Sequence, residues 1–272
     1  MKRLPRPALR PFVETLWSMD EAAPARGSGR REHVIPTGRM HLVFRLSDDP
    51  LLLFDQDEDR EGRVVSTMVV GGARAHYYIR DVSRPLCSVG AVLRPGAAQV
   101  LFGVDAHELA DRHTPLEDLW GTDARSMRDQ LGDARSCEGR LDAFEHLLTQ
   151  RLPIVRGLHP AVARALERLG SPTAVHEIVK QSGYSHRRFI TLFSRAVGLT
   201  PKMYARVMRF QRALRRVTTS EGRESWIDVA SAAGYSDQSH FNREFREFTG
   251  VTPGEYRLTL PRAPHHVPVG LP

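Results

Sequence analysis

The sequence predicts an α+β protein with two domains. We expect the N-terminal domain to be a small antiparallel β-barrel or sheet with helices. We expect the C-terminal domain to be all-α, with two helix-turn-helix units joined by a long helix. Three observations support this prediction: short β-type runs in the first hundred residues, helical periodicity after residue 96, and an internal repeat in the last hundred residues. A length of 272 residues is also typical of about two domains.

The N-terminal domain is predicted from the spacing of its β-type runs, which lie at 41–46, 51–54, 64–70, 75–79 and 87–93. Turn signals separate these runs at intervals too short for βαβ units, which favours antiparallel pairing. A loop rich in glycine, proline and arginine is expected at 21–32. Helices are expected at 97–102, at 106–111 and before Pro153, because proline ends a helix. We therefore place this domain at 1–153.

The last hundred residues contain one pattern twice. Gly-Tyr-Ser occurs at 183–185 and at 234–236, each time followed by two phenylalanines four residues apart and then by Gly-x-Thr-Pro. Phe189 and Phe241 are separated by 52 positions, as are Gly198 and Gly250. Glycine, proline and aromatic positions that recur in register indicate two copies of one helix-turn-helix unit. Such a unit lays its second helix in the major groove of DNA.

Local signals predict where the helices of each copy end and begin. Gly183 and Gly234 can adopt the left-handed conformation that a tight turn needs. Ser185 is a good N-cap for the second helix of the first copy, and Ser236 or Asp237 fills that role in the second copy. The paired phenylalanines fall on the inward faces, so we expect them in the core.

A long helix is predicted between the two copies. Thr200 is its expected N-cap and Pro201 takes the first helical position. Its apolar residues share one face and its arginines point elsewhere. We expect this helix to be a rigid strut that holds the two second helices about 34 Å apart, the distance between successive major-groove faces on one side of B-DNA.

Positive charge is concentrated in the half of the chain that contains the repeat. Residues 1–150 hold 20 Lys and Arg against 23 Asp and Glu, whereas residues 151–272 hold 19 against 9. A basic domain is expected where the partner is a phosphate backbone. An anionic membrane surface would attract the same charge, but arginine outnumbers lysine and the charges lie among helix-turn signals. We therefore expect double-stranded DNA as the partner and no membrane.

The remaining sequence signals indicate a cytoplasmic protein. Cys87 and Cys137 have no CxxC spacing, so we expect reduced thiols. The N-terminus lacks the apolar stretch of a signal peptide, and no run approaches the roughly 20 apolar residues of a membrane span. The proline-rich residues 259–272 are expected to be a disordered tail.

Taken together, residues 160–258 resemble the AraC/XylS-type transcription regulators. The resemblance includes both Gly-Tyr-Ser motifs, both Thr-Pro sequences and the arginine-rich helix containing Arg209-Phe210-Gln211. It implies a DNA-binding domain at 158–258 and a sequence-specific transcription regulator. Contact with RNA polymerase is the expected route by which such a protein would act as an activator.

The resemblance also implies which side chains meet DNA. Its base-reading positions fall on Arg187, Ile190 and Thr191 in the first unit and on Ser239, His240 and Arg243 in the second. Arginine, serine and histidine can donate to base edges. Ile190 departs from the polar residue common at its position, so it contacts a thymine methyl group or the first unit binds largely through phosphates. Phosphate or secondary contacts are expected from Arg188, Arg195, Arg209, Arg212, Gln238 and Asn242.

The N-terminal residues resemble, less specifically, the sensor-like domain of one branch of this family. The stretches that carry this resemblance are 35–44, 93–98 and 115–121. It implies a barrel that binds a small-molecule effector or forms a homodimer. The expected effector-binding side chains are Arg39, Tyr78, Arg94 and Trp120.

Two alternatives stay open: a regulator without an effector, and a DNA-binding module fused to a metal-dependent barrel enzyme. His33, His41 and His76 lie near strands but lack the closely set His-x-His and downstream acid of a cupin metal site. Neither cysteine lies in the Pro-Cys-His motif of a repair methyltransferase. We therefore expect no catalytic residue, no metal and no cofactor.

Overall fold

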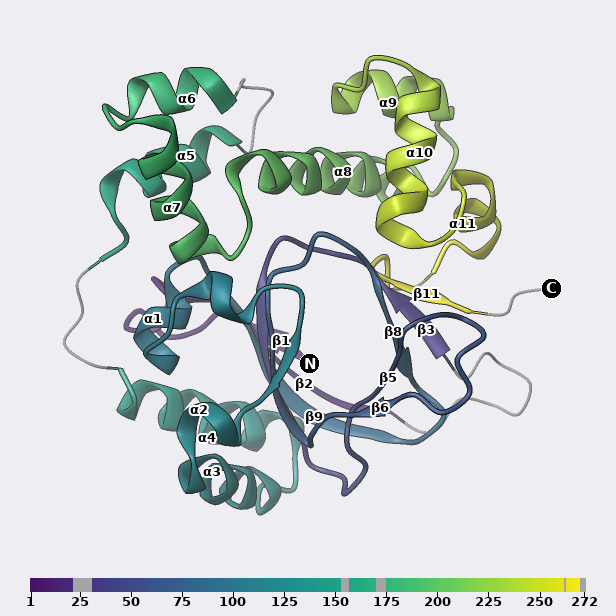
Figure 1. Cartoon of the computed structure of the whole chain (residues 1–272). Helices are drawn as coiled ribbons and strands as arrows, with labels where there is room; N and C mark the ends of the chain where they lie inside the picture. Colours follow the sequence, from purple (N-terminus) through teal and green to yellow (C-terminus); the bar gives the residue numbers. More distant parts are fainter. Residues whose placement is uncertain (22–30, 153–156, 170–174, 262, 270–272) are drawn as a thin grey trace.

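The computed structural model describes residues 1–21, 31–152, 157–169, 175–261 and 263–269 (Figure 1). Its N-terminal part is a barrel of two antiparallel sheets with helices outside it, and its C-terminal part is helical. The predicted α+β fold class is confirmed.

Within the described residues, one sheet has the order β1-β2-β9-β4-β7-β10 and the other β11-β3-β8-β5-β6. Every pairing is antiparallel, as the short intervals between the runs predicted. The strands are β1 Lys2–Arg3, β2 Val13–Glu21, β3 Arg31–Val34, β4 Met40–Arg45, β5 Leu52–Phe54, β6 Arg63–Val64, β7 Met68–Gly71, β8 Tyr78–Asp81, β9 Leu86–Leu93, β10 His113–Pro115 and β11 His266–Pro268.

Strand β4 shows how the sequence gives the first sheet two different faces. Side chains alternate across a strand, and Leu42 and Phe44 are fully buried in the main core. Phe44 meets Phe144 edge-on at 5.7 Å, so this face packs against the helices. Val43 lies on the opposite face and packs against a small cluster that includes Leu53 of the second sheet. The opposite face therefore lines the interior of the barrel.

The helices of the N-terminal domain follow the sheet strands and cover the first sheet. They are α1 Ala97–Phe102, a 3-10 turn η1 Ala106–Leu109, α2 Glu117–Trp120, α3 Thr122–Gly132 and α4 Cys137–Gln150. The prediction of a helix at 97–102 is confirmed. The run expected at 64–70 is divided between β6 and β7, and α4 ends at Gln150, before Pro153. Pro153 and residues 22–30 of the expected loop lie outside the described residues.

The C-terminal part is helical, as predicted, and its elements are α5 Pro160–Leu169, α6 Val175–Gln181, α7 His186–Val197, α8 Pro201–Thr219, α9 Trp226–Ala233, α10 Gln238–Thr249 and α11 Pro253–Thr259. The expected start of the long helix is confirmed: the Thr200 side chain accepts a hydrogen bond from the Met203 amide at 3.2 Å, and Pro201 is in the first turn. At 1.5 Å per residue, α8 is about 28 Å long. It runs between the two units and lies against the barrel (Figure 1).

Side chains and backbone groups join the helical part to the barrel. The Gly96 amide donates to the Ala196 carbonyl at 2.8 Å, and Gln211 Nε2 of α8 donates to the Pro36 carbonyl at 2.8 Å. The buried core is continuous between the two parts. The predicted domain boundary at 153–158 stays a prediction, since residues 153–156 lie outside the described chain.

The expectation of a disordered tail at 259–272 is wrong for residues 263–269. Residues His266–Pro268 form β11, which pairs antiparallel with β3 at the edge of the second sheet. The prolines suggested disorder, but β11 is an edge strand, where a proline is tolerated because no neighbour needs its missing amide.

Candidate nucleic-acid interface

The first helix-turn-helix unit forms as its sequence predicts. Gly183 ends the turn region after α6 with a φ of 74°, in the left-handed region that glycine favours. Ser185 caps α7 and accepts from the Arg188 amide at 3.4 Å. Phe189 and Phe193 are fully buried, which confirms that they belong to the core. Val197 is buried as well, whereas His186, Arg187, Arg188, Thr191 and Arg195 of α7 are exposed.

The second unit repeats this construction at the other end of α8. Gly234 has a φ of 87°, and Asp237 is the N-cap of α10, accepting from the His240 amide at 2.7 Å. This settles the alternative between Ser236 and Asp237, since the Ser236 hydroxyl donates to the Asp237 carboxylate instead. Phe241 and Phe245 are fully buried, so the core prediction is confirmed here too.

The two second helices, α7 and α10, end against the barrel and begin away from it (Figure 1). A Cβ added to Gly198 at the end of α7 would lie 3.2 Å from the Ala106 carbonyl oxygen. A Cβ added to Gly250 at the end of α10 would overlap the His33 ring. The opposite ends of both helices, where the expected base-reading residues lie, are consequently left uncovered by the barrel.

The six expected base-reading positions differ in exposure. Arg187, Thr191, Ser239 and Arg243 are exposed, whereas Ile190 and His240 are half-buried. Thr191 donates its hydroxyl hydrogen to the Arg187 carbonyl at 3.1 Å. His240 has its Nδ1 3.1 Å from the Ser236 hydroxyl and its Nε2 3.4 Å from Arg209 Nη2. The assignment of these residues to base reading stays a prediction.

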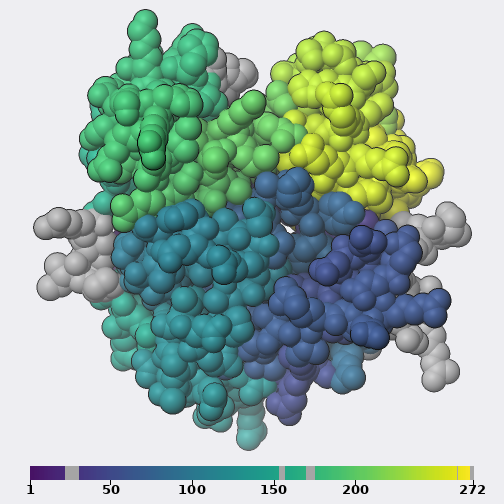
Figure 2. Space-filling view, viewed as in Figure 1, coloured from purple at the N-terminus to yellow at the C-terminus, as the bar shows by residue number. Residues whose placement is uncertain are grey.

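A groove of about 710 Å³ separates the two units above α8. Figure 2 shows it as a notch between the first unit and the second. Its lining includes Lys202, Arg206, Arg209 and Arg212 of α8 and Arg243 of α10. Cationic side chains therefore line the space between the two candidate recognition helices.

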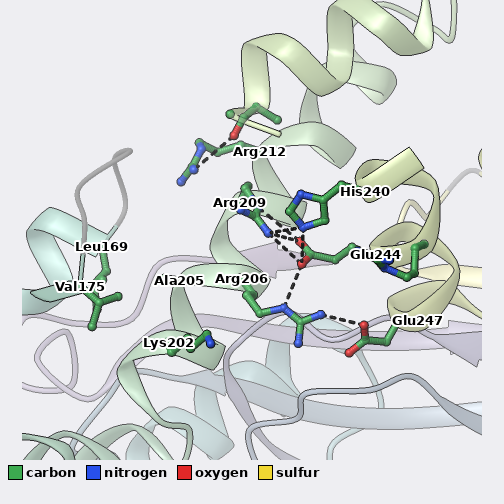
Figure 3. Close-up of a pocket in the computed structure, with 13 residues that line it drawn as sticks. Leu169, Val175, Lys202, Ala205, Arg206, Arg209, Arg212, His240, Glu244 and Glu247 are labelled. Carbon is green, nitrogen blue, oxygen red and sulfur yellow. Dashed lines mark hydrogen bonds and ion pairs between the residues drawn. The ribbon is translucent and has the colours of Figure 1, made fainter. Parts of the chain in front are cut away.

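One buried carboxylate organises part of this groove (Figure 3). Glu244 of α10 has a side chain only 2% exposed. Its oxygens accept from Arg206 Nε at 2.9 Å, from Arg209 Nη2 at 2.8 Å and from the Tyr235 hydroxyl at 2.8 Å. Arg206 also donates to Glu247 at 2.7 Å. This set of contacts, the Glu244 network, fixes α10 on α8.

The Glu244 network changes the interpretation of Arg209. The sequence predicted a phosphate or secondary DNA contact for this residue, but its guanidinium faces Glu244 and lies 4.4 Å over the Tyr235 ring. Sequence reasoning missed Glu244 and Tyr235. The helical spacing could have indicated the burial of Glu244, because this residue lies three positions after Phe241 and four before Phe248, on the inward face of α10.

The other expected phosphate or secondary residues have varied surroundings. Arg195 donates to Asp105 of the N-terminal domain at 2.7 Å, so it also serves as a link to that domain. Arg212 contacts the Ala233 carbonyl at 3.5 Å. Arg188, Gln238 and Asn242 are exposed on α7 and α10.

The four expected effector-binding residues have separate partners. Arg39 donates to Glu14 at 2.7 Å and to the Tyr204 hydroxyl of α8 at 2.8 Å, so it joins the domains. Trp120 donates its indole N–H to the Leu101 carbonyl at 2.8 Å and packs on Phe102 among the helices. Tyr78 meets His113 edge-on at 4.5 Å, and Arg94 is exposed. The structure presents these four side chains in different surroundings rather than as one cluster.

The histidines near the strands are largely engaged with other protein groups. His33 Nδ1 lies 2.8 Å from the Thr249 carbonyl at the end of α10, and its Nε2 lies 2.8 Å from Asp57. Burial lowers the pKa of His41 to about 4. His76 is exposed. Across the described residues, no group of three or more His, Cys, Asp or Glu side chains is placed to hold a metal ion.

Known proteins match both parts of the chain. Residues 163–259 match the family of the helix-turn-helix domain, and residues 1–115 match a domain of unknown function, DUF6597. The putative HTH-type transcriptional regulator YkgA of Escherichia coli (strain K12) is 34% identical over 91 residues, which cover 33% of this chain and 36% of YkgA. The HTH-type transcriptional regulator ArgR of Pseudomonas aeruginosa is 29% identical over 115 residues, covering 40% and 34% of the two chains.

A solved structure of ToxT from Vibrio cholerae O395 aligns with 91% of this chain and 97% of its own length, with a TM-score of 0.46 and 10% identity. The chain spans about a third of the length of the curated relatives YkgA and ArgR.

None of the helices in the described part of the chain combines the length and apolar character needed to cross a membrane.

The paired units and these matches define residues 163–259 as a helix-turn-helix domain similar to the domains of known transcription regulators. The matched region, residues 163–259, is the part of the chain that carries the resemblance to the AraC/XylS-type regulators, and these matches support that resemblance.

Proposed function

We propose that this protein is a sequence-specific DNA-binding transcription regulator whose two units read one duplex together. The observation that carries this proposal is the matched pair α7 and α10. Both helices begin away from the barrel, both expose polar side chains there, and cationic residues line the groove between them. Arginine, serine and threonine on a helix in the major groove can discriminate base pairs. The regulator has RNA polymerase as a further partner and acts in the cytoplasm.

Arg243 tests base reading in the second unit. Arg243→Ala is expected to weaken binding by about 1–3 kcal/mol and to relax preference at a single base position, since arginine recognises guanine through two hydrogen bonds. The measurement is affinity against a library of single-base variants of a site selected in vitro by the full chain. Arg246→Ala is the matched control: Arg246 is exposed on the same helix, one turn nearer the barrel. Equal loss on every sequence from Arg243→Ala would contradict base reading there.

A second proposal is that the barrel interior binds a small effector rather than performing a reaction. The observation that favours it is a group of polar side chains facing inward from both sheets. Tyr78 meets His113, and His113 Nδ1 lies 2.9 Å from Arg74 Nη2. Burial, followed by the charge of Arg74, holds the pKa of His113 well below its usual range. This interior offers neutral imidazole and phenol groups beside a guanidinium.

The effector proposal predicts ligand-dependent stability without chemistry. Small carboxylic acids and phenols that bind the interior are expected to raise the melting temperature of the full chain, because a ligand that binds only the folded state stabilises it. Tyr78→Phe is expected to reduce this rise. The protein is then analysed for metals and for turnover of the bound compound. Stoichiometric metal in the barrel, or product formation, would favour the enzyme alternative, and the absence of any stabilising compound would favour a regulator without an effector or a homodimer-forming barrel.

A further inference from the structure

The chain returns to the barrel after its last DNA-binding helix. Helix α11 ends at Thr259, and the next residue, Leu260, has a positive φ of 29° that turns the backbone. The Tyr256 hydroxyl of α11 donates to the Pro264 carbonyl at 2.9 Å, which directs the chain toward the second sheet. Figure 1 shows β11 beside β3 under the second unit.

Residues 263–269, named here the strap, are held to β3 by backbone hydrogen bonds at both ends. The Ile35 amide donates to the His265 carbonyl at 2.9 Å, and the Val269 amide donates to the Arg31 carbonyl at 2.9 Å. Val267 of the strap is only 1% exposed and belongs to the main core. A three-residue edge strand is thus anchored by a buried side chain as well as by its backbone.

Charged and polar side chains add to this attachment. His266 Nδ1 lies 2.6 Å from Glu32 of β3, and Arg80 of β8 donates to the same carboxylate. Burial acts to raise the pKa of Glu32, but the hydrogen bond with His266 and the positive charge of Arg80 prevail and lower this pKa to about 2. Glu32 is therefore ionised at neutral pH and can hold the strap through His266.

One buried amide joins the strap to the strut helix. Gln211 of α8 is 5% exposed, and its Oε1 lies 2.8 Å from His265 Nε2. Its Nε2 donates to the Pro36 carbonyl, which follows β3. Burial lowers the pKa of His265 to about 4, so this imidazole is neutral at pH 7 and donates to the amide oxygen. The strap, α8 and the barrel meet at this glutamine.

The second unit consequently contacts the barrel at two places. The end of α10 meets His33 of β3, and the strap that follows α11 pairs with the outer edge of that same strand. The first unit uses other groups, among them Arg195, which donates to Asp105. The second unit alone is followed by a segment that becomes part of the sheet.

We propose that the strap is a conformational device that fixes the second helix-turn-helix unit on the β3 edge and so couples the barrel to the position of α10. Its effect on DNA binding rests on the function proposed above. When the strap is paired with β3, α10 is held in one position relative to α7. The free protein has then already lost the conformational entropy that binding of both helices to one duplex would otherwise cost. Such preorganisation raises affinity.

The experiment compares full-length variants by hydrogen exchange and by DNA binding. Val267→Asp places a charge in a buried position and should unseat the strap, whereas His265→Ala removes only the contact with Gln211 and is the milder variant. Leu258→Ala is the control, since that side chain is 89% exposed on α11. Both strap variants are expected to accelerate amide exchange at least about tenfold in β3 and at the end of α10, but not in α7, because local opening frees only the contacts involved.

The DNA arm uses a site selected by the unmodified chain and a shortened duplex that retains only the segment read by the first unit. Val267→Asp is expected to weaken binding to the full site about tenfold, equal to about 1.4 kcal/mol, and to leave the shortened duplex unaffected. If amide exchange in the strap variants becomes faster in β3 but not at the end of α10, the strap does not fix the second unit. The same conclusion follows if exchange is unchanged in both segments. Unchanged affinity for the full site despite faster exchange at α10 would overturn the coupling.

The two arms separate this inference from the proposed function. If the unmodified chain shows no preference among DNA sequences, the proposed function fails, but hydrogen exchange still decides whether the strap fixes the second unit. If sequence preference is present and the exchange pattern is unaltered in both strap variants, the strap inference alone fails.

Discussion

Replacing both Arg206 and Arg209 with methionine is expected to destabilise the second unit by about 3–5 kcal/mol. This change leaves Glu244 in a buried position without either guanidinium and with only the His240 ring nearby, 3.9 Å away. Removing the partners of a buried charge costs about that much. The carboxylate would keep the Tyr235 hydroxyl as a donor, which supplies no charge. Chemical denaturation measures the loss, followed by tryptophan fluorescence in a full chain whose other two tryptophans, Trp17 and Trp120, are replaced by phenylalanine so that only Trp226 of this unit reports.

A triple variant separates folding from DNA contact. Adding Glu244→Leu to the two methionine substitutions removes the buried carboxylate that has lost its arginines. Replacing a buried ion pair with well-packed apolar residues often leaves the free energy of unfolding unchanged or raises it. We expect the triple variant to recover most of the lost stability and, with it, DNA affinity. If stability returns while affinity stays low on every sequence, Arg206 or Arg209 contacts phosphate directly, and the purely structural interpretation of the Glu244 network is wrong.

Several elements were predictable because their causes are local. Gly183, Ser185 and Thr200 act within a few residues of their own positions, so their types suffice to mark a turn or a helix start. Phe189 and Phe241 fall on inward faces because helical periodicity repeats along the chain. The antiparallel pairing followed from the short intervals between the strands.

The features that the sequence did not reveal depend on contacts between distant positions. Arg209 and Glu244 are 35 positions apart, and His266 and Glu32 are 234 apart. Nothing in a local pattern distinguishes an arginine that faces DNA from one that faces a buried glutamate on another helix. The same holds for Arg39, whose guanidinium was expected to bind an effector but donates to Glu14 and Tyr204.

The strap shows a related limit of compositional reasoning. Prolines and histidines after residue 260 are typical of a loose tail. Val267 nevertheless occupies a buried position in the core, and the edge of β3 supplies backbone partners for the strand. Only the folded barrel creates that edge, so the composition of the tail could not indicate it.

The central claim is that two units on one stiff helix read a single face of the same duplex. The most direct measurement is the affinity of the full chain for its selected site after base pairs are inserted between the two recognised segments. About 5 inserted base pairs turn the second segment to the opposite face, because the helical repeat is about 10–10.5 base pairs.

We expect that insertion to weaken binding about 100-fold, or about 2.7 kcal/mol. Insertion of a full turn restores the face but moves the segment about 34 Å farther away, a distance α8 cannot extend to reach. We therefore expect the affinity for DNA to stay low after both insertions. Unchanged affinity after the half-turn insertion would show that only one unit reads DNA, and recovery after the full-turn insertion would show that the two units are flexibly tethered.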